Sequence, residues 1–107
     1  MNSVVEYGIS CWENRIARSD TFAGSELSHE NRQVWMQLVR HHTKPSPVID
    51  KLFDAANLTT DQFLAAQERG NARRTAKLRE KLAGIFAQLR KACSEAGPSR
   101  GERNLGD

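Results

Sequence analysis

Three histidines and two cysteines are the residues of this chain best suited to bind a metal ion or act as nucleophiles. They are His29, His41, His42, Cys11 and Cys93. His41 and His42 are adjacent, so on a helix their side chains point about 100° apart and do not readily share a tetrahedral site. The sequence has no Cys-x-x-Cys spacing. We therefore expect no metal site and no cofactor.

Paired carboxylates, or a thiol beside a histidine, could also support catalysis. Glu26 and Glu30 are four residues apart, but two acids at the start of a helix are better explained by the positive end of its dipole. Cys93 lies beside an apolar stripe, where a small buried thiol is the usual case. The sequence contains no glycine-rich phosphate loop, and it predicts a protein that is not an enzyme.

The size and composition of the chain restrict its class. It has 107 residues, 38% of them hydrophobic and 27% charged, which suits one small domain and excludes a two-domain enzyme or a TIM barrel. No apolar run approaches the roughly 20 residues of a membrane span, and Glu6, Glu13 and Arg15 interrupt the only apolar start. We expect a cytoplasmic protein with reduced thiols, a Cys11–Cys93 disulfide being the less favoured alternative.

Charge is distributed unevenly along the chain, whose formal net charge is +3. Residues 68–91 hold eight basic and two acidic side chains, which gives this segment a net charge of +6. The other eight basic and eleven acidic side chains give −3. The sequence therefore predicts a basic helix attached to an acidic body.

Apolar residues at helical spacing indicate two helices in the first half of the chain. The first covers residues 3–18, with a short extended start as the alternative. Its apolar face consists of Val5, Ile9, Trp12 and Ile16. The second begins at a cap on Ser25 and ends near His42. Its apolar stripe consists of Leu27, Val34, Trp35, Leu38 and Val39.

Prolines and capping residues mark the middle of the chain. Ser46 followed by Pro47 suits the start of a third helix, and Asn57 suits its end. Thr59 and Gln62 then form a capping-box pattern, which predicts that a further helix begins there. The sequence thus predicts a tight corner between these two helices.

The most regular pattern lies in residues 72–96, where apolar residues alternate at spacings of three and four. This heptad seam predicts one helix about 37 Å long, ended by Gly97 and Pro98. The seam consists of Thr75, Leu78, Leu82, Ile85, Leu89, Ala92 and Ala96. We therefore predict an all-α fold: a small bundle of four to five helices over residues 1–97 with a long C-terminal helix, followed by a disordered tail over 98–107.

The long basic helix has three interpretations. In the first, the apolar seam packs against the rest of the protein and the charged side of the helix faces solvent. Its seam can instead join two copies into a homodimer, since it is long for so small a body to cover. The residues predicted for self-association are Leu78, Leu82, Ile85 and Leu89. The third interpretation is phosphate binding, in which the cations that line one side are Arg69, Arg73, Arg74 and Lys77.

Residues 52–70 resemble the helix-turn-helix of small repressors. The resemblance is carried by Leu52, Ala56, Asn57, Leu58, Thr59 and Phe63. The segment departs from that family where bases would be read, because Asp61, Gln62 and the apolar residues 63–66 offer little to base edges. A tight helical corner without DNA produces the same pattern.

The two tryptophans, Trp12 and Trp35, lie on predicted apolar faces and suit core positions. The second helix nevertheless carries more apolar surface than one buried face needs, and such a surplus is typical of a surface that binds another protein. The predicted partner-binding residues are Trp35, Met36, Leu38 and Val39.

Three longer segments resemble the quorum-sensing antiactivators of the QslA type: residues 26–42, 45–63 and 77–93. The resemblance implies a small all-helical homodimer that binds the ligand-binding domain of a LuxR-type transcription activator. Binding there would cover the dimerisation surface of the activator and prevent it from holding DNA. The resemblance implies no catalytic or cofactor-binding residues.

The function predicted from the sequence is therefore regulatory binding of a transcription activator. The alternative is a small regulator that binds DNA or RNA through the basic helix 69–81 and the corner 52–70. A surface that binds a protein needs apolar residues with charges at its rim, whereas a surface that binds nucleic acid needs unpaired cations.

Overall fold

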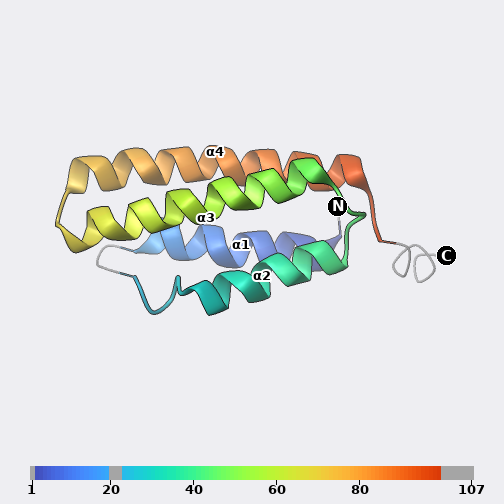
Figure 1. The fold of residues 1–107 in the computed structure, drawn as a ribbon, viewed down its shortest axis with the longest axis horizontal. Coiled ribbons are helices and arrows are strands. Elements are labelled where there is room, and N and C mark those ends of the chain that lie inside the picture. Colours follow the sequence, from blue (N-terminus) through green and yellow to red (C-terminus); the bar gives the residue numbers. More distant parts are fainter. Residues whose placement is uncertain (1, 20–22, 100–107) are drawn as a thin grey trace.

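The computed structural model describes residues 2–19 and 23–99 and contains four α-helices, each antiparallel to the next along the chain (Figure 1). α1 spans Ser3–Arg18, α2 spans His29–His41, α3 spans Pro47–Glu68 and α4 spans Ala72–Ala96. The predicted all-α bundle with a long C-terminal helix is confirmed. None of the four helices in the described ranges is both long and apolar enough to cross a membrane.

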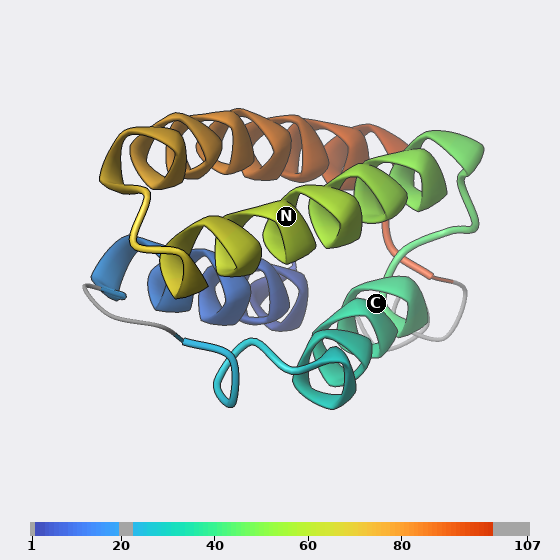
Figure 2. The same ribbon diagram turned by 60° about the vertical axis from the view of Figure 1, so that its left-hand side comes forward.

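The helices form a four-cornered bundle in which α2 and α4 lie on opposite sides (Figures 1 and 2). α3 packs along α4, and α1 packs against both α2 and α4. Polar side chains at the starts of the helices explain where they begin, because each accepts a hydrogen bond from a backbone N–H of the first turn. These caps are Asn2, Ser28, Ser46 and Asn71.

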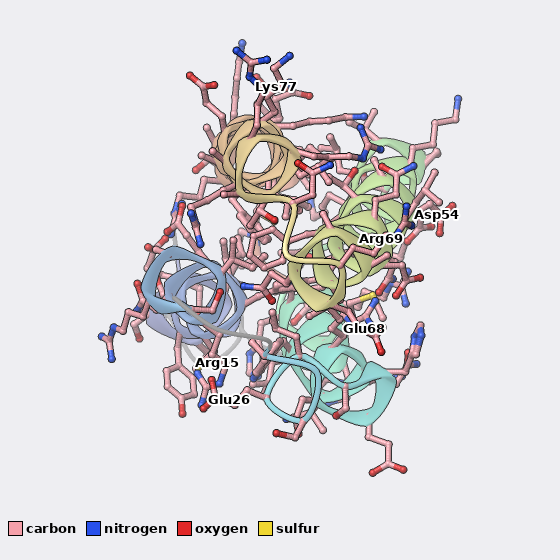
Figure 3. All side chains as sticks on the ribbon, turned by 90° about the vertical axis from the view of Figure 1, so that its left-hand side faces the viewer. Arg15, Glu26, Asp54, Glu68, Arg69 and Lys77 are labelled. Carbon is pink, nitrogen blue, oxygen red and sulfur yellow. The ribbon has the colours of Figure 1, made fainter. Side chains whose placement is uncertain are left out.

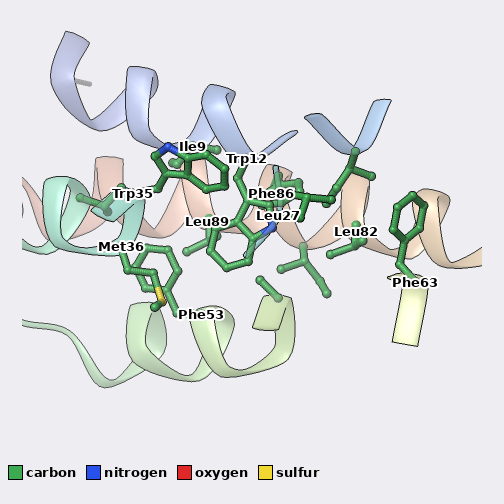
Figure 4. Close-up of a cluster of buried hydrophobic side chains, with 14 of the residues drawn as sticks. Ile9, Trp12, Leu27, Trp35, Met36, Phe53, Phe63, Leu82, Phe86 and Leu89 are labelled. Atoms are coloured by element: carbon green, nitrogen blue, oxygen red, sulfur yellow. The ribbon is translucent and has the colours of Figure 1, made fainter. Parts of the chain in front are cut away.

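One aromatic side chain from each helix meets in the core (Figure 4). The ring of Trp12 lies 6.0 Å from that of Trp35, 6.4 Å from that of Phe53 and 5.8 Å from that of Phe86, measured between centroids. The indole N–H of Trp12 donates to the hydroxyl of Thr60 over 3.0 Å. The central tryptophan is thus buried with its polar atom satisfied, as burial in an apolar core requires.

The start of α2 differs from the prediction. Ser28, and not Ser25, caps the helix by accepting from the N–H of Asn31 at 3.2 Å. The preceding residues form a separate turn, in which the N–H of Leu27 donates to the carbonyl of Ala23 at 2.9 Å. This turn places Leu27 in the core with no exposed surface. The apolar stripe of α2 therefore did not reveal where its helix begins.

The predicted corner after Asn57 is wrong, because α3 continues without a break from Pro47 to Glu68. Asn57 does not end a helix, since its side chain is used between helices. Its Oδ1 accepts from Arg32 at 3.3 Å and its amide donates to the sulfur of Met36 at 3.3 Å. Thr59, the predicted cap, is buried in the middle of the helix.

The chain just after α4 is tied back to the α2–α3 connection. The N–H of Lys44 donates to the carbonyl of Gly97 at 3.1 Å, and the N–H of Ser99 donates to the carbonyl of His42 at 3.4 Å. Residues 98–99 therefore do not belong to a disordered tail. The rest of the predicted tail, residues 100–107, lies outside the described residues.

Candidate functional site

Three of the four residues predicted to bind a partner are part of the core. The exposed fractions of Trp35, Met36 and Val39 are 7%, 6% and 1%, because α1 and α3 cover the face of α2 on which they lie (Figure 4). Only Leu38 is partly exposed. Of these four residues, a partner can contact only Leu38 at the surface. The prediction that Trp35, Met36 and Val39 bind a partner is therefore wrong.

The seam predicted for self-association is also internal. Leu78, Leu82, Ile85 and Leu89 are buried in the same core cluster as the aromatic residues. The other helices of the same chain cover this stripe along α4. The prediction that this seam is too long for one small body to cover is therefore wrong. A homodimer therefore needs another surface.

The four cations predicted to bind phosphate lie at the end of the bundle where α3 connects to α4. Arg69, Arg73, Arg74 and Lys77 are exposed, and Figure 3 shows Arg69 on the α3 side and Lys77 on the outer side of α4. Within the described ranges, no ion pair involves any of their side chains. We call these four residues the basic surface.

Two other cations of α4 are not available to a ligand, because they hold α1 in place. Arg79 donates to the carbonyls of Ile16 and Ser19 at 3.1 and 2.7 Å. Arg90 lies between two carboxylates of α1, 3.0 Å from Glu6 and 2.7 Å from Glu13. These contacts lower the pKa of Glu6 and raise that of Arg90. The net charge of +6 on residues 68–91 thus overstates the positive charge that is available at the surface.

α1 and α2 approach each other closely at Gly8, and Tyr7, Cys11 and Leu38 lie near this point. A Cβ at Gly8 would lie 3.1 Å from the carbonyl oxygen of Trp35 and 3.5 Å from the Cβ of Leu38, so only glycine lets the helices come this close. Tyr7, the residue before Gly8, is 61% exposed. A hydrogen bond to Cys11, one turn further along α1, raises the pKa of the Tyr7 phenol. We call Tyr7, Cys11 and Leu38 the α1–α2 strip.

A polar hollow of about 520 Å³ lies between the end of α1 and the chain leading into α2. It is lined by Asn14, Arg15, Arg18, Ser25, Glu26 and Asn31. Arg15 joins it to the strip, because its guanidinium donates to the carbonyl of Cys11 at 3.1 Å and lies over the ring of Trp35 at 5.2 Å. Figure 3 shows Arg15 and Glu26 on this side of the bundle. The strip thus has charged groups at its rim.

The histidines and cysteines are dispersed. His29 lies 3.5 Å from the carboxylate of Asp61, and the rings of His41 and His42 are 5.7 Å apart between centroids. In the part of the chain that the structure describes, no group of three or more His, Cys, Asp or Glu residues could hold a metal ion. Cys11 and Cys93 are free thiols, and burial raises the pKa of Cys93 to about 11.

Sequence reasoning missed Tyr7. It falls outside the apolar face of residues 5, 9, 12 and 16, and an aromatic residue on the polar side of an amphipathic helix was the available signal. Comparisons with protein-family models, with curated proteins and with solved structures found no match to this chain.

Proposed function

We propose that this chain is a non-enzymatic regulatory protein that binds a LuxR-type transcription activator and blocks its dimerisation and DNA binding. The observation that supports this best is the α1–α2 strip, in which Tyr7 is exposed and Cys11 and Leu38 are partly exposed beside a completed core. The resemblance of residues 26–42, 45–63 and 77–93 to QslA-type antiactivators supplies the class of partner. Such a partner works on DNA, which places the encounter in the cytoplasm.

The strip suits a protein partner for three reasons. Tyr7 offers a large, partly apolar ring that can bury its body and keep its hydroxyl hydrogen-bonded, which is typical of residues that dominate binding energy. Gly8 holds the strip on two closely packed helices, so little order is lost on binding. The charges of Arg15, Arg18 and Glu26 lie at one end, where rim charges steer and orient an encounter.

Two variants with equal exposure test this site. Tyr7 and Leu58 are both 61% exposed, on α1 and α3 respectively. With a purified LuxR-type ligand-binding domain, Tyr7→Asp should weaken binding by about 2 kcal/mol, or thirtyfold, whereas Leu58→Asp should leave it within about threefold. Calorimetric titration of each full-length variant measures this difference. Equal binding by both variants would move the site elsewhere.

The basic surface supports a second candidate function, binding of DNA or RNA. Arg73 and Arg74 stand in the first turn of α4, where the helix dipole disfavours positive charge, and no acid of the described chain pairs with them. An anionic ligand would offset that cost. The helix-turn-helix form of this alternative is excluded, because α3 has no corner.

Salt dependence separates the two candidates. A protein that contacts phosphates through four cations loses affinity steeply as salt rises, with a slope of log K against log salt of about −3 to −4 on duplex DNA. A mobility-shift titration with random duplex at low salt measures this. Tight and steeply salt-dependent binding would favour the nucleic-acid function over binding of an activator.

A further inference from the structure

α3 and α4 each carry a row of residues on the outside of the bundle, repeated every three or four positions. The α3 row, which ends at the C-cap, consists of Lys51, Ala55, Leu58, Gln62, Ala65 and Arg69. The α4 row consists of Arg74, Lys77, Lys81, Gly84, Gln88 and Lys91. None of these residues is buried. We call the two rows together the α3–α4 face.

The two rows border the contact between α3 and α4 from the outside. The two helices pack along each other in opposite directions (Figure 1). Asn57 and Asp61 mark the α2 side of α3, because both bond to Arg32. Arg79 and Arg90 mark the α1 side of α4, because both bond to α1. With about 100° of turn per residue, the two rows point away from these contacts, so both remain open to solvent.

The α3–α4 face is strongly basic. Its two rows hold six cations and no acid, and Glu95 is the first acid in line with the α4 row, one turn beyond Lys91. Within the described ranges, none of the six cations takes part in an ion pair. Figure 3 shows Lys77 on the outer side of α4, whereas Glu68 lies nearer to α2. A surface with this charge attracts an anionic ligand.

The middle of the face is apolar and built from small residues. Leu58 is 61% exposed, and Ala55 lies one turn before it. Gly84 and Ala56 are equally far in sequence from the turn at Gly70, so antiparallel packing places Gly84 across from this part of α3. A Cβ at Gly84 would meet nothing within 4 Å. Glycine is unfavourable in the middle of a helix, and it is useful where another backbone must come close.

We propose that the α3–α4 face binds an acidic amphipathic helix of another protein. Spacings of three and four residues are those by which one helix inserts side chains between those of its neighbours. The α3 row is about 27 Å long, which suits a helix of about 18 residues. Carboxylates on both sides of its apolar stripe would meet the cations of the two rows. Its apolar side chains would cover Leu58 and approach closely at Gly84.

The apolar middle favours a protein over a nucleic acid as the ligand of this face. Phosphates would use the six cations, but they would leave Leu58 uncovered and give no reason for the glycine at position 84. An acidic amphipathic helix accounts for the cations, the exposed leucine and the glycine together. The proposal does not rest on binding of an activator, which depends on Tyr7 at the α1–α2 strip.

A designed peptide of about 18 residues tests the chemistry of the ligand. It carries Leu at the a and d positions of its heptads and Glu at the e and g positions. We expect this labelled peptide to bind the full chain with a dissociation constant on the order of 10 µM, measured by fluorescence anisotropy at about 0.1 M salt. A scrambled peptide keeps the charge but loses the apolar stripe, so it should bind about tenfold more weakly or worse.

Two matched pairs of variants test the location. Leu58→Asp and Tyr7→Asp change the net charge equally, and both replace a side chain that is 61% exposed. Leu58→Asp should weaken peptide binding about tenfold, whereas Tyr7→Asp should leave it within about twofold. Lys81→Glu should weaken it about fivefold, whereas Lys44→Glu, on the exposed α2–α3 connection, should leave it within about twofold. Circular dichroism and thermal unfolding separate a lost contact from a lost fold.

Three results would overturn the proposal. The first is no binding of the designed peptide below about 1 mM, or equal binding of the scrambled one, which would reflect charge alone. The second is an equal loss in Leu58→Asp and Tyr7→Asp. The third is random duplex DNA that binds more tightly than the peptide and responds to Lys81→Glu but not to Leu58→Asp, which would assign the face to nucleic acid. Activator binding is measured separately with the ligand-binding domain, so failure of either proposal is distinguishable.

Discussion

Arg32 of α2 donates a hydrogen bond over 2.9 Å to the carboxylate of Asp61 on α3. The same guanidinium donates to the carbonyl of Leu27 at 2.9 Å and to both side-chain and backbone oxygens of Asn57 at 3.3 Å. Its exposed fraction is 2%. One buried cation therefore joins the turn before α2, α2 itself and the middle of α3.

Replacement of Arg32 should cost more than replacement of any surface cation. Arg32→Met leaves the carbonyl of Leu27 without its side-chain donor and Asp61 without its cation, so we expect a loss of about 2–4 kcal/mol in the free energy of unfolding. Arg40→Met is the control, because the pair between Arg40 and Asp50 is exposed and should be worth about 1 kcal/mol or less. Urea unfolding measures both, and equal losses would contradict this role for Arg32.

The same contacts explain why α3 has no break where the sequence predicted one. Asn57, Thr59 and Gln62 carry the local signals of one helix ending and another beginning, and a short window of sequence contains nothing against them. The signal that overrides them comes from distant residues. Asn57 is held by Arg32, and the hydroxyl of Thr60 accepts from Trp12, 48 residues away. Tertiary contacts thus decide the length of this helix.

Two helical glycines should respond in opposite directions to alanine. A Cβ at Gly84 would meet nothing within 4 Å, so Gly84→Ala should stabilise the fold by about 0.5–1 kcal/mol through its better helix propensity. A Cβ at Gly8 would lie 3.1 Å from the backbone oxygen of Trp35, and that oxygen cannot move without displacing α2. Gly8→Ala should therefore be destabilising despite the same gain in propensity. Thermal unfolding that raises both midpoints would contradict the close approach of α1 and α2.

The carboxylate of Glu6, which pairs with Arg90, should make stability depend on pH in the acid range. Hydrogen bonding to Arg90 holds the pKa of Glu6 below its ordinary value in the folded state. The stabilisation is therefore complete above the ordinary carboxyl pKa of about 4.3 and is lost as the pH falls through the lowered folded-state pKa. The pair is partly exposed, so the effect should be about 0.5–1 kcal/mol.

Unfolding free energies at pH 6 and pH 3 measure this effect. Glu6→Gln and Arg90→Gln should both lose less stability between these two pH values than the wild type does. An Arg90→Gln variant that kept the full pH dependence of the wild type would show that Arg90 is not the cause.

The two thiols should differ in reactivity. Cys93 is buried on α4 and its pKa is raised to about 11, whereas Cys11 is partly exposed on α1. A maleimide at neutral pH should therefore label Cys11 in the native protein and Cys93 only after denaturation. Peptide mass spectrometry after timed labelling checks this, and native labelling of both at the same rate would contradict the burial of Cys93.

The sequence predicted the helices better than the surfaces. The heptad spacing of Leu78, Leu82 and Leu89 identified an apolar stripe, but spacing alone does not say whether a stripe meets the same chain or another. The same holds for Trp35 and Met36: both are predicted to bind a partner, with a core position as the other interpretation of Trp35, and both lie in the core. Charge behaves in the same way: the sequence predicts that Arg79 and Arg90 belong to a basic face, but both are bonded to α1. Each of these outcomes depends on which helices are neighbours.

One measurement tests the central claim and its rival together: the fluorescence anisotropy of a labelled target duplex bound by a purified LuxR-type activator, during titration with this chain. When this chain binds the activator, the duplex should be released. The anisotropy should therefore fall to the value of free duplex once the chain is near-stoichiometric with the activator. The chain alone should leave the duplex unbound at the same salt concentration. Anisotropy that stays constant, or that rises when the chain is added to the duplex alone, would contradict the proposed function.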